Sequence, residues 1–116
     1  MSRSLSALDP AFRPYAEILV QAGRTLGTVH ITSTRRDWVD QERLYLDYLS
    51  GRRPLPALPP DRSLHVRGLA VDLVVGKYEA GGPPSPEMVA LGQWWLAGGG
   101  RWGGAADPVH FSAPVQ

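Results

Sequence analysis

The stretch SLHVRGLAVDLVV, residues 63–75, decides the fold because it has the pattern of a buried strand interrupted by one charge. Six of its last seven residues are apolar, and the seventh is Asp72. A carboxylate in such a strand is costly unless a partner neutralises it. Three environments would satisfy Asp72: an arginine, water at an edge strand, or a divalent cation that it ligates.

Two histidines favour the cation. His65 lies seven residues before Asp72, and Gly68 between them permits a bend that returns the imidazole to the carboxylate. His110 stands between two apolar residues that would face the core, so its own side chain would point into a cleft. Each histidine alone could be an ordinary packed or surface residue. Together with Asp72 they offer two nitrogens and one oxygen, which leaves a fourth position for water as in catalytic zinc sites.

Hydrolysis at such a site also needs a base, and Asp107 is the candidate. It precedes His110 by three residues, and residues i and i+3 of a straight strand face opposite ways. Asp107 can therefore reach the site only if the chain kinks, which Pro108 permits. The alternative is that Asp107 only caps the turn after Gly103 and Gly104.

Composition limits the function. The chain has 116 residues, which we assign to one domain (1–116), and a formal net charge of +1, which argues against a broad nucleic-acid surface. It has no cysteine and three histidines, so any metal must rest on His, Asp or Glu. No apolar run is long enough to span a membrane, and the N-terminal residues lack a signal-peptide pattern. We expect no membrane partner and no secretory export.

The rest of the chain predicts an α+β fold with antiparallel pairing. Residues 52–61, RRPLPALPPD, contain four prolines and predict a stiff surface loop near the mouth of the site. The four tryptophans should lie mostly in the core. The expected helices cover 9–27, 36–51 and 85–98, and the expected strands cover 28–34, 69–75, 101–102 and 109–111.

Three segments resemble one known family, the D-Ala-D-Ala metallopeptidases. Its members include D,D-carboxypeptidases, D-Ala-D-Ala dipeptidases and phage L-alanyl-D-glutamate endolysins. SLHVRGLAVD resembles the Ser-x-His-x-x-Gly-x-Ala-x-Asp signature, and WGGAADPVHF (102–111) is similar to the closing segment. ITSTRRDWVDQERLY (31–45) is similar to the Ile-Thr-Ser-Gly-Tyr-Arg-Ser block that precedes Gln and Leu-Tyr. All five fixed positions of the signature match: Ser63, His65, Gly68, Ala70 and Asp72.

The resemblance implies a hedgehog/D-Ala-D-Ala peptidase-like fold: a small antiparallel sheet, about three helices packed around one side, and Zn²⁺ in a cleft on the sheet. It implies that Asp107 is the general base and that Arg36 contacts the substrate carbonyl and the developing oxyanion. Thr34-Arg35 replaces the usual Gly-Tyr, so Arg35 competes with Arg36 for that role. The implied zinc ligands are His65, Asp72 and His110.

The resemblance also places two residues near a bound peptide, Ser63 and Gln41, and Trp102 is a further candidate to line the cleft. It implies hydrolysis of peptidoglycan stem peptides. Because the base is Asp rather than Glu, we favour a phage-type L-alanyl-D-glutamate endopeptidase. The alternatives are a D,D-carboxypeptidase or dipeptidase, and a non-catalytic phage structural module. We expect a monomer that stays in the host cytoplasm until release, or travels in a virion, and acts on the cell wall. Manganese or cobalt would suit the same ligands.

Overall fold

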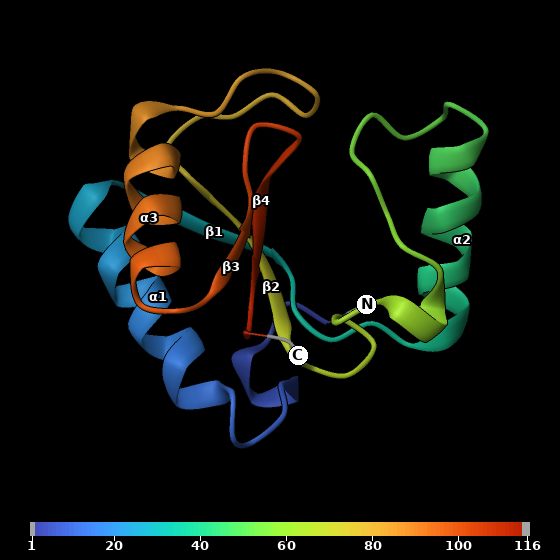
Figure 1. Ribbon diagram of the computed structural model, residues 1–116, viewed down its shortest axis with the longest axis horizontal. Helices are drawn as coiled ribbons and strands as arrows, with labels where there is room; N and C mark the ends of the chain where they lie inside the picture. The colour runs from blue at the N-terminus through green and yellow to red at the C-terminus, as the bar shows by residue number, and fades with distance from the viewer. Residues whose placement is uncertain (1, 115–116) are drawn as a thin grey trace.

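The structure is a computed structural model of the protein, described here over residues 2–114. Within this range a four-stranded antiparallel sheet, in the order β1-β2-β4-β3, is combined with three α-helices (Figure 1). The α+β fold expected from the sequence is confirmed. The strands are β1 (Val29–Ser33), β2 (Ala70–Val75), β3 (Arg101–Gly103) and β4 (Asp107–Ser112); the helices are α1 (Arg13–Leu26), α2 (Trp38–Leu49) and α3 (Pro86–Ala97); and two 3-10 turns are η1 (Leu5–Ala7) and η2 (Pro60–Arg62).

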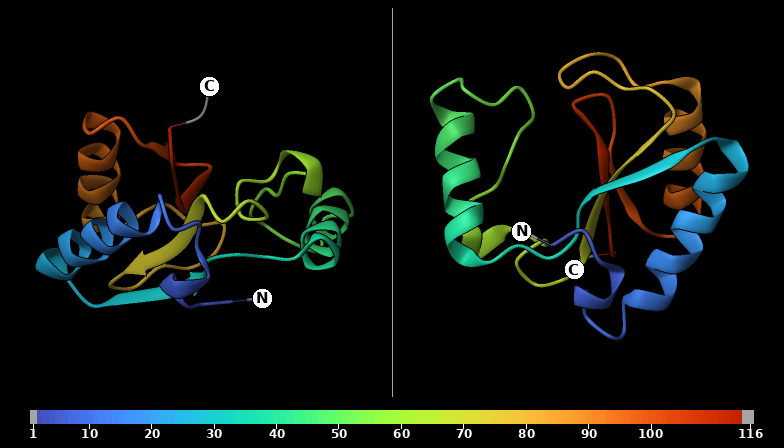
Figure 2. Two further views of the ribbon diagram at one scale, coloured as in Figure 1. Left: turned by 90° about the horizontal axis from the view of Figure 1, so that it is seen from below. Right: turned by 180° about the vertical axis from the view of Figure 1, so that it is seen from behind.

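The core lies between the sheet and two of the helices, α1 and α3, which cover the same face (Figure 2). Along β2, Val71, Leu73 and Val75 are fully buried in this core and alternate with residues on the other face. Asp72 belongs to that other face, because successive strand residues point to opposite sides. Strand β2 is central rather than an edge, so bulk water at an open edge does not solvate the carboxylate.

The resemblance implied that all the helices pack around one side of the sheet. Helix α2 departs from this arrangement, because it does not pack against the sheet with α1 and α3. It stands apart, on the far side of the strands, and contacts η2 (Figures 1 and 2). Its one buried residue is Gln41, whereas the side chains of Trp38 and Leu49 are 55% and 60% exposed. The sheet and α2 therefore form two walls of the cleft that holds the site.

Two local predictions need correction. Helix α1 begins at Arg13 rather than at Asp9, because the Asp9 carboxylate accepts a hydrogen bond from the Ala11 N–H at 2.9 Å and forms a separate turn. Of the tryptophans, Trp95 is a core residue, whereas Trp94 is 46% exposed. In the part of the chain that the structure covers, no helix has the length and apolar character needed to cross a bilayer.

Candidate metal centre

Two neighbouring central strands bring the first pair of site residues together. Asp72 of β2 lies directly opposite His110 of β4, and opposed residues of antiparallel strands share a face. The His110 Nδ1 atom lies 3.4 Å from Asp72 Oδ1. His110 therefore faces the cleft, whereas its neighbours Val109 and Phe111 are buried in the core, as the sequence predicts.

The third residue arrives through the expected bend at Gly68. This glycine has φ +72°, and its N–H donates to the His65 carbonyl at 3.2 Å. A Cβ at position 68 would lie 2.7 Å from the Asp9 backbone nitrogen, so the turn requires glycine. The bend returns His65 to β2, where its Nε2 lies 3.0 Å from Asp72 Oδ1.

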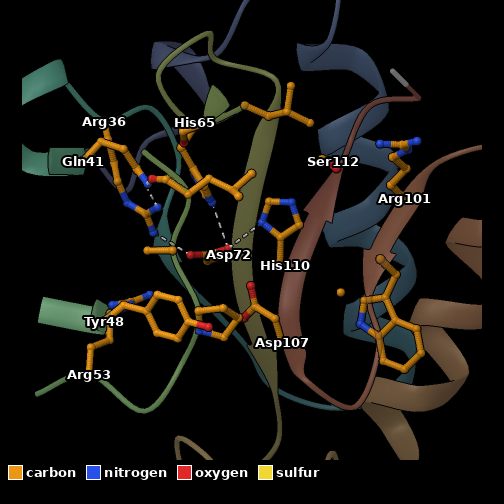
Figure 3. Close-up of a pocket in the computed structure, with 17 residues that line it drawn as sticks. Arg36, Gln41, Tyr48, Arg53, His65, Asp72, Arg101, Asp107, His110 and Ser112 are labelled. Carbon is orange, nitrogen blue, oxygen red and sulfur yellow. Dashed lines mark hydrogen bonds and ion pairs between the residues drawn. The ribbon is translucent and has the colours of Figure 1, made fainter. Parts of the chain in front are cut away.

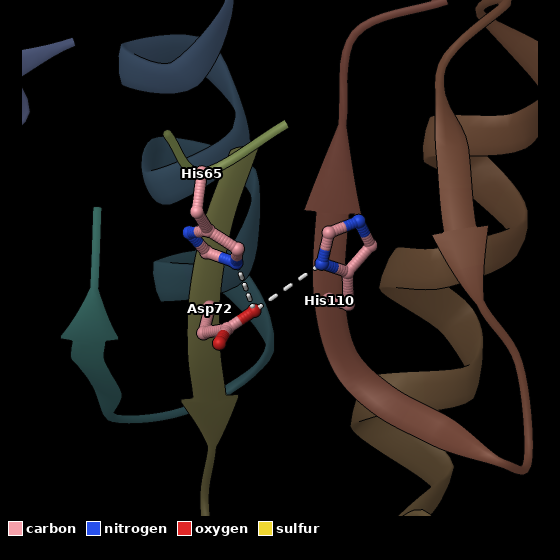
Figure 4. A group of neighbouring side chains, drawn as sticks. All are labelled: His65, Asp72 and His110. Carbon is pink, nitrogen blue, oxygen red and sulfur yellow. Dashed lines mark hydrogen bonds and ion pairs between the residues drawn. The ribbon is translucent and has the colours of Figure 1, made fainter. Parts of the chain in front are cut away.

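His65, Asp72 and His110 thus form one cluster (Figure 4). Each contributes a potential ligand atom, and these three atoms lie within 4.8 Å of one another. Two imidazoles and one carboxylate match the donors that zinc prefers. The remaining histidine, His30, is exposed on β1 and takes no part.

The hydrogen bonds of the His65 ring indicate whether the cluster suits a cation. Its Nδ1 lies 2.6 Å from the Thr34 carbonyl oxygen, which can only accept, so Nδ1 carries the proton. A neutral His65 then directs the lone pair of Nε2 at the Asp72 carboxylate, which is unfavourable unless a cation lies between them or the ring is protonated. Metal-binding histidines are commonly oriented by such a bond from the second ring nitrogen. The cluster therefore fits a divalent metal.

The residue that orients His65 is itself fixed by the N-terminal segment. The Thr34 N–H donates to the Ser2 carbonyl and its Oγ1 to the Ser4 carbonyl, both at 2.8 Å. Thr34 is fully buried. The threonine at position 34 is thus held in place by hydrogen bonds to the backbone of residues 2–4.

Asp72 also pairs with an arginine, Arg36, which was one of the alternatives that the sequence left open for this carboxylate. One Nη of Arg36 donates to Asp72 Oδ2 at 2.6 Å, and the other donates to Gln41 Oε1 at 3.1 Å. Burial alone would raise the pKa of Asp72, but His65, His110 and Arg36 outweigh it and hold that pKa well below its usual value. Arg35 is exposed, so the structure places Arg36 rather than Arg35 in the site.

Asp107 reaches the same cleft through an irregularity in β4. In the pairing of β3 with β4, Trp102 lies opposite Phe111, but the next residue, Gly103, lies opposite Asp107. An advance of one residue along β3 therefore corresponds to four residues along β4, which makes β4 irregular at this point. Any side chain at Gly103 would collide with the Asp107 backbone, which explains the glycine there. Asp107 lines the pocket beside Asp72 and His110 (Figure 3).

The environment of Asp107 suits a base that works near neutral pH. Burial, together with the negative charge of Asp72, raises its pKa from 3.8 to about 6, although His110, Arg53 and Arg36 partly offset the rise. Its Oδ1 is buried and has no hydrogen-bond partner among the described residues. A buried carboxylate oxygen without a protein partner, in a residue that lines the pocket, is a place where a bound water or substrate group would complete the hydrogen bonding.

The pocket around these residues has a volume of about 440 Å³, and its lining includes the three predicted substrate-binding residues. Ser63 is 4% exposed, and the Gln41 amide donates to the Leu58 carbonyl at 2.7 Å, which joins α2 to the proline-rich loop. The Trp102 indole N–H donates to the Pro108 carbonyl at 2.8 Å. Their contact with substrate stays a prediction.

Four further polar residues line this pocket that the sequence did not single out: Tyr48, Arg53, Arg101 and Ser112. Ser112 could have been found, because it lies two residues after His110 and so shares its face of β4. The other three come from α2, the proline-rich loop and β3. The loop lies at the pocket as the sequence predicts, but no pattern in the sequence marks these three side chains as part of its lining.

The fold and site define an α+β protein with a His-Asp-His cluster in a cleft on an antiparallel sheet. A solved structure with this fold is that of the vancomycin resistance D,D-dipeptidase VanXYg in complex with a D-Ala-D-Ala phosphinate analogue. The TM-score is 0.65 at 18% sequence identity, over 91% of this chain and 50% of the dipeptidase. The chain thus spans about half the length of that protein, and the peptidase-like fold expected from the resemblance is present. No family model matches the sequence, and no curated protein does.

Proposed function

We propose that the protein is a zinc-dependent peptidase that hydrolyses peptidoglycan stem peptides. One observation carries the proposal: three metal-ligand side chains converge at 4.8 Å or less in a pocket that also holds a carboxyl group with a pKa of about 6. Such a combination of ligands and a tuned base is what metal-assisted hydrolysis requires. The fold it shares with a D,D-dipeptidase supports the same chemistry.

Zn²⁺ bound by His65, Asp72 and His110 would supply Lewis-acid polarisation and make a water nucleophilic at neutral pH. Asp107 is ionised above its pKa of about 6, so it can accept the water proton and deliver it to the leaving amine. The guanidinium of Arg36 holds Asp72 and lines the same pocket, where its charge favours a developing oxyanion.

For the scissile bond we favour L-alanyl-D-glutamate, as in phage endolysins, because the proposed base is Asp107 rather than a glutamate. Removal of D-Ala or D-Ala-D-Ala is the second candidate, and the fold shared with a D,D-dipeptidase favours it. We further propose that the protein acts as a monomer on the cell wall, either after release from the host cytoplasm or from a virion, without nucleic-acid or membrane partners.

Digestion of purified peptidoglycan by the zinc-loaded protein, followed by mass spectrometry of the fragments, tests this function. Fragments that begin with D-Glu are expected; release of D-Ala or of D-Ala-D-Ala would instead support the second candidate. Asp107→Asn should retain zinc and release nothing. Asp61→Asn, which alters an exposed acid of η2 outside the pocket lining, is the matched control and should digest normally. Zinc binding by the unaltered protein without cleavage of any stem peptide would favour a non-catalytic module.

A further inference from the structure

The cleft carries more positive charge than its own acids balance. Three arginines line it, and Arg36 is paired with Asp72. The other two, Arg53 and Arg101, lie on opposite sides of the metal cluster (Figure 3). Within residues 2–114 neither has an acidic partner within ion-pair distance. A metal ion in the cluster would add further positive charge, so the cleft suits an anionic ligand.

Of these two side chains, Arg53 is the more fixed. Its backbone N–H donates to the Asp47 carbonyl at the end of α2, and its Nε–H donates to the Leu55 carbonyl, both at 3.1 Å. Leu55 is 9% exposed and anchors the loop in the core, while Pro54 and Pro56 stiffen the chain on either side. The bond from Nε sets the plane of the guanidinium and leaves its two terminal nitrogens for a ligand.

Arg53 also lies close enough to the reacting groups to influence them. Its charge lowers the pKa of Asp107 and the pKa of Arg36, the two groups that we place in catalysis. Figure 3 shows it beside Tyr48, on the wall of the pocket formed by α2 and the loop. Arg101, in contrast, is an exposed side chain on β3.

We propose that Arg53 is a specificity-determining residue that binds a free carboxylate on the substrate residue next to the scissile bond. The proposal rests on the proposed peptidase function and names its substrate class. A planar guanidinium held without a counter-ion matches a carboxylate in a two-point, charge-assisted contact, whereas a carboxamide loses the charge. In a stem peptide the γ-linked D-Glu carries such a carboxylate, so amidated stem peptides would be poor substrates.

Two synthetic peptides test this: L-Ala-γ-D-Glu-L-Lys and the same peptide with the α-carboxylate of D-Glu converted to a carboxamide. For the zinc-loaded protein we expect kcat/KM to favour the carboxylate about tenfold or more. Arg53→Gln should bring the ratio of the two kcat/KM values close to one. A purely structural role for Arg53 would lower both values together and leave the ratio intact, which would overturn the proposal.

Two matched variants sharpen the result. Arg52→Gln alters the neighbouring arginine, which is 72% exposed, lies outside the pocket lining and faces Asp47 at 3.4 Å, and it should preserve both rates. Arg101→Gln should preserve the ratio; if it removes the preference and Arg53→Gln does not, the assignment to Arg53 is wrong.

Binding separates this proposal from the peptidase function. If neither peptide is cleaved, the L-alanyl-D-glutamate activity is wrong, and calorimetric dissociation constants for the same two peptides then decide the role of Arg53. Tighter binding of the carboxylate, abolished by Arg53→Gln, supports the proposal. Equal binding of the two peptides by the unaltered protein, or no binding of either, overturns it.

Discussion

Replacement of Asp107 by asparagine should stabilise the metal-free protein at neutral pH while it abolishes turnover. The pKa of Asp107 is raised from 3.8 to about 6 by burial and by the charge of Asp72. A carboxyl group with a higher pKa in the folded than in the unfolded state is protonated more readily when folded. Its contribution to the free energy of unfolding therefore falls as pH rises from about 4 to about 6, and stays low above that.

The size of the effect follows from the shift. About two pKa units correspond to about 3 kcal/mol, and solvent screening of a partly exposed group reduces this to about 1–2 kcal/mol. Asparagine has nearly the same shape without the charge, so Asp107→Asn should recover this amount. For a chain of this length the melting temperature should rise by roughly 4–8 °C.

Thermal unfolding followed by circular dichroism, with a chelator present, measures the difference at pH 7.5 and again at pH 4. The gain should be present at pH 7.5 and nearly absent at pH 4, where the original carboxyl is protonated in the folded state. Asp61→Asn, at an exposed position, should show no gain at either pH. An Asp107→Asn variant that is no more stable at pH 7.5, or whose gain is the same at both pH values, would refute the reasoning.

Other expected outcomes concern the metal cluster and its supporting turn. His65→Ala should release the metal, measured by elemental analysis, and lower the melting temperature, because Asp72 loses a partner. Removal of the metal from the unaltered protein by a chelator should lower the melting temperature as well, since a ligand bound to the folded state stabilises it. Gly68→Ala should cost about 2–3 kcal/mol in urea unfolding, because φ +72° is unfavourable and the new Cβ would lie 2.7 Å from the Asp9 nitrogen. Gly51→Ala, at φ +79° with nothing within 4 Å, should cost only about 1 kcal/mol.

The cluster of His65, Asp72 and His110 was predictable because its geometry is local or follows from strand alternation. Asp72 was identified as the one charged residue in an apolar strand. The bend at Gly68 predicted that His65 lies near it, and the alternation of side chains along β4 predicted that His110 points away from the core. Pro108 marked the irregular entry of β4, but the change of pairing partner that carries Asp107 into the cleft depends on Gly103 as well.

The wall of the pocket that α2 and the proline-rich loop form was less predictable, because it depends on contacts between segments that are distant in the sequence. The spacing of α2 predicts its helix but not that it stands away from the sheet, since apolar residues such as Trp38 remain exposed. The bond from Arg36 to Asp72 spans 36 positions, and the place of Arg53 depends on how the proline-rich loop packs through Leu55. Neither leaves a periodic pattern in the sequence.

The central claim is that one divalent metal is held jointly by His65, Asp72 and His110, and anomalous diffraction from crystals of the zinc-loaded protein tests it most directly. We expect one zinc peak per chain within about 2.0–2.2 Å of His65 Nε2, a carboxylate oxygen of Asp72 and a ring nitrogen of His110. A zinc peak elsewhere, or none at this cluster in zinc-saturated crystals, would contradict the account.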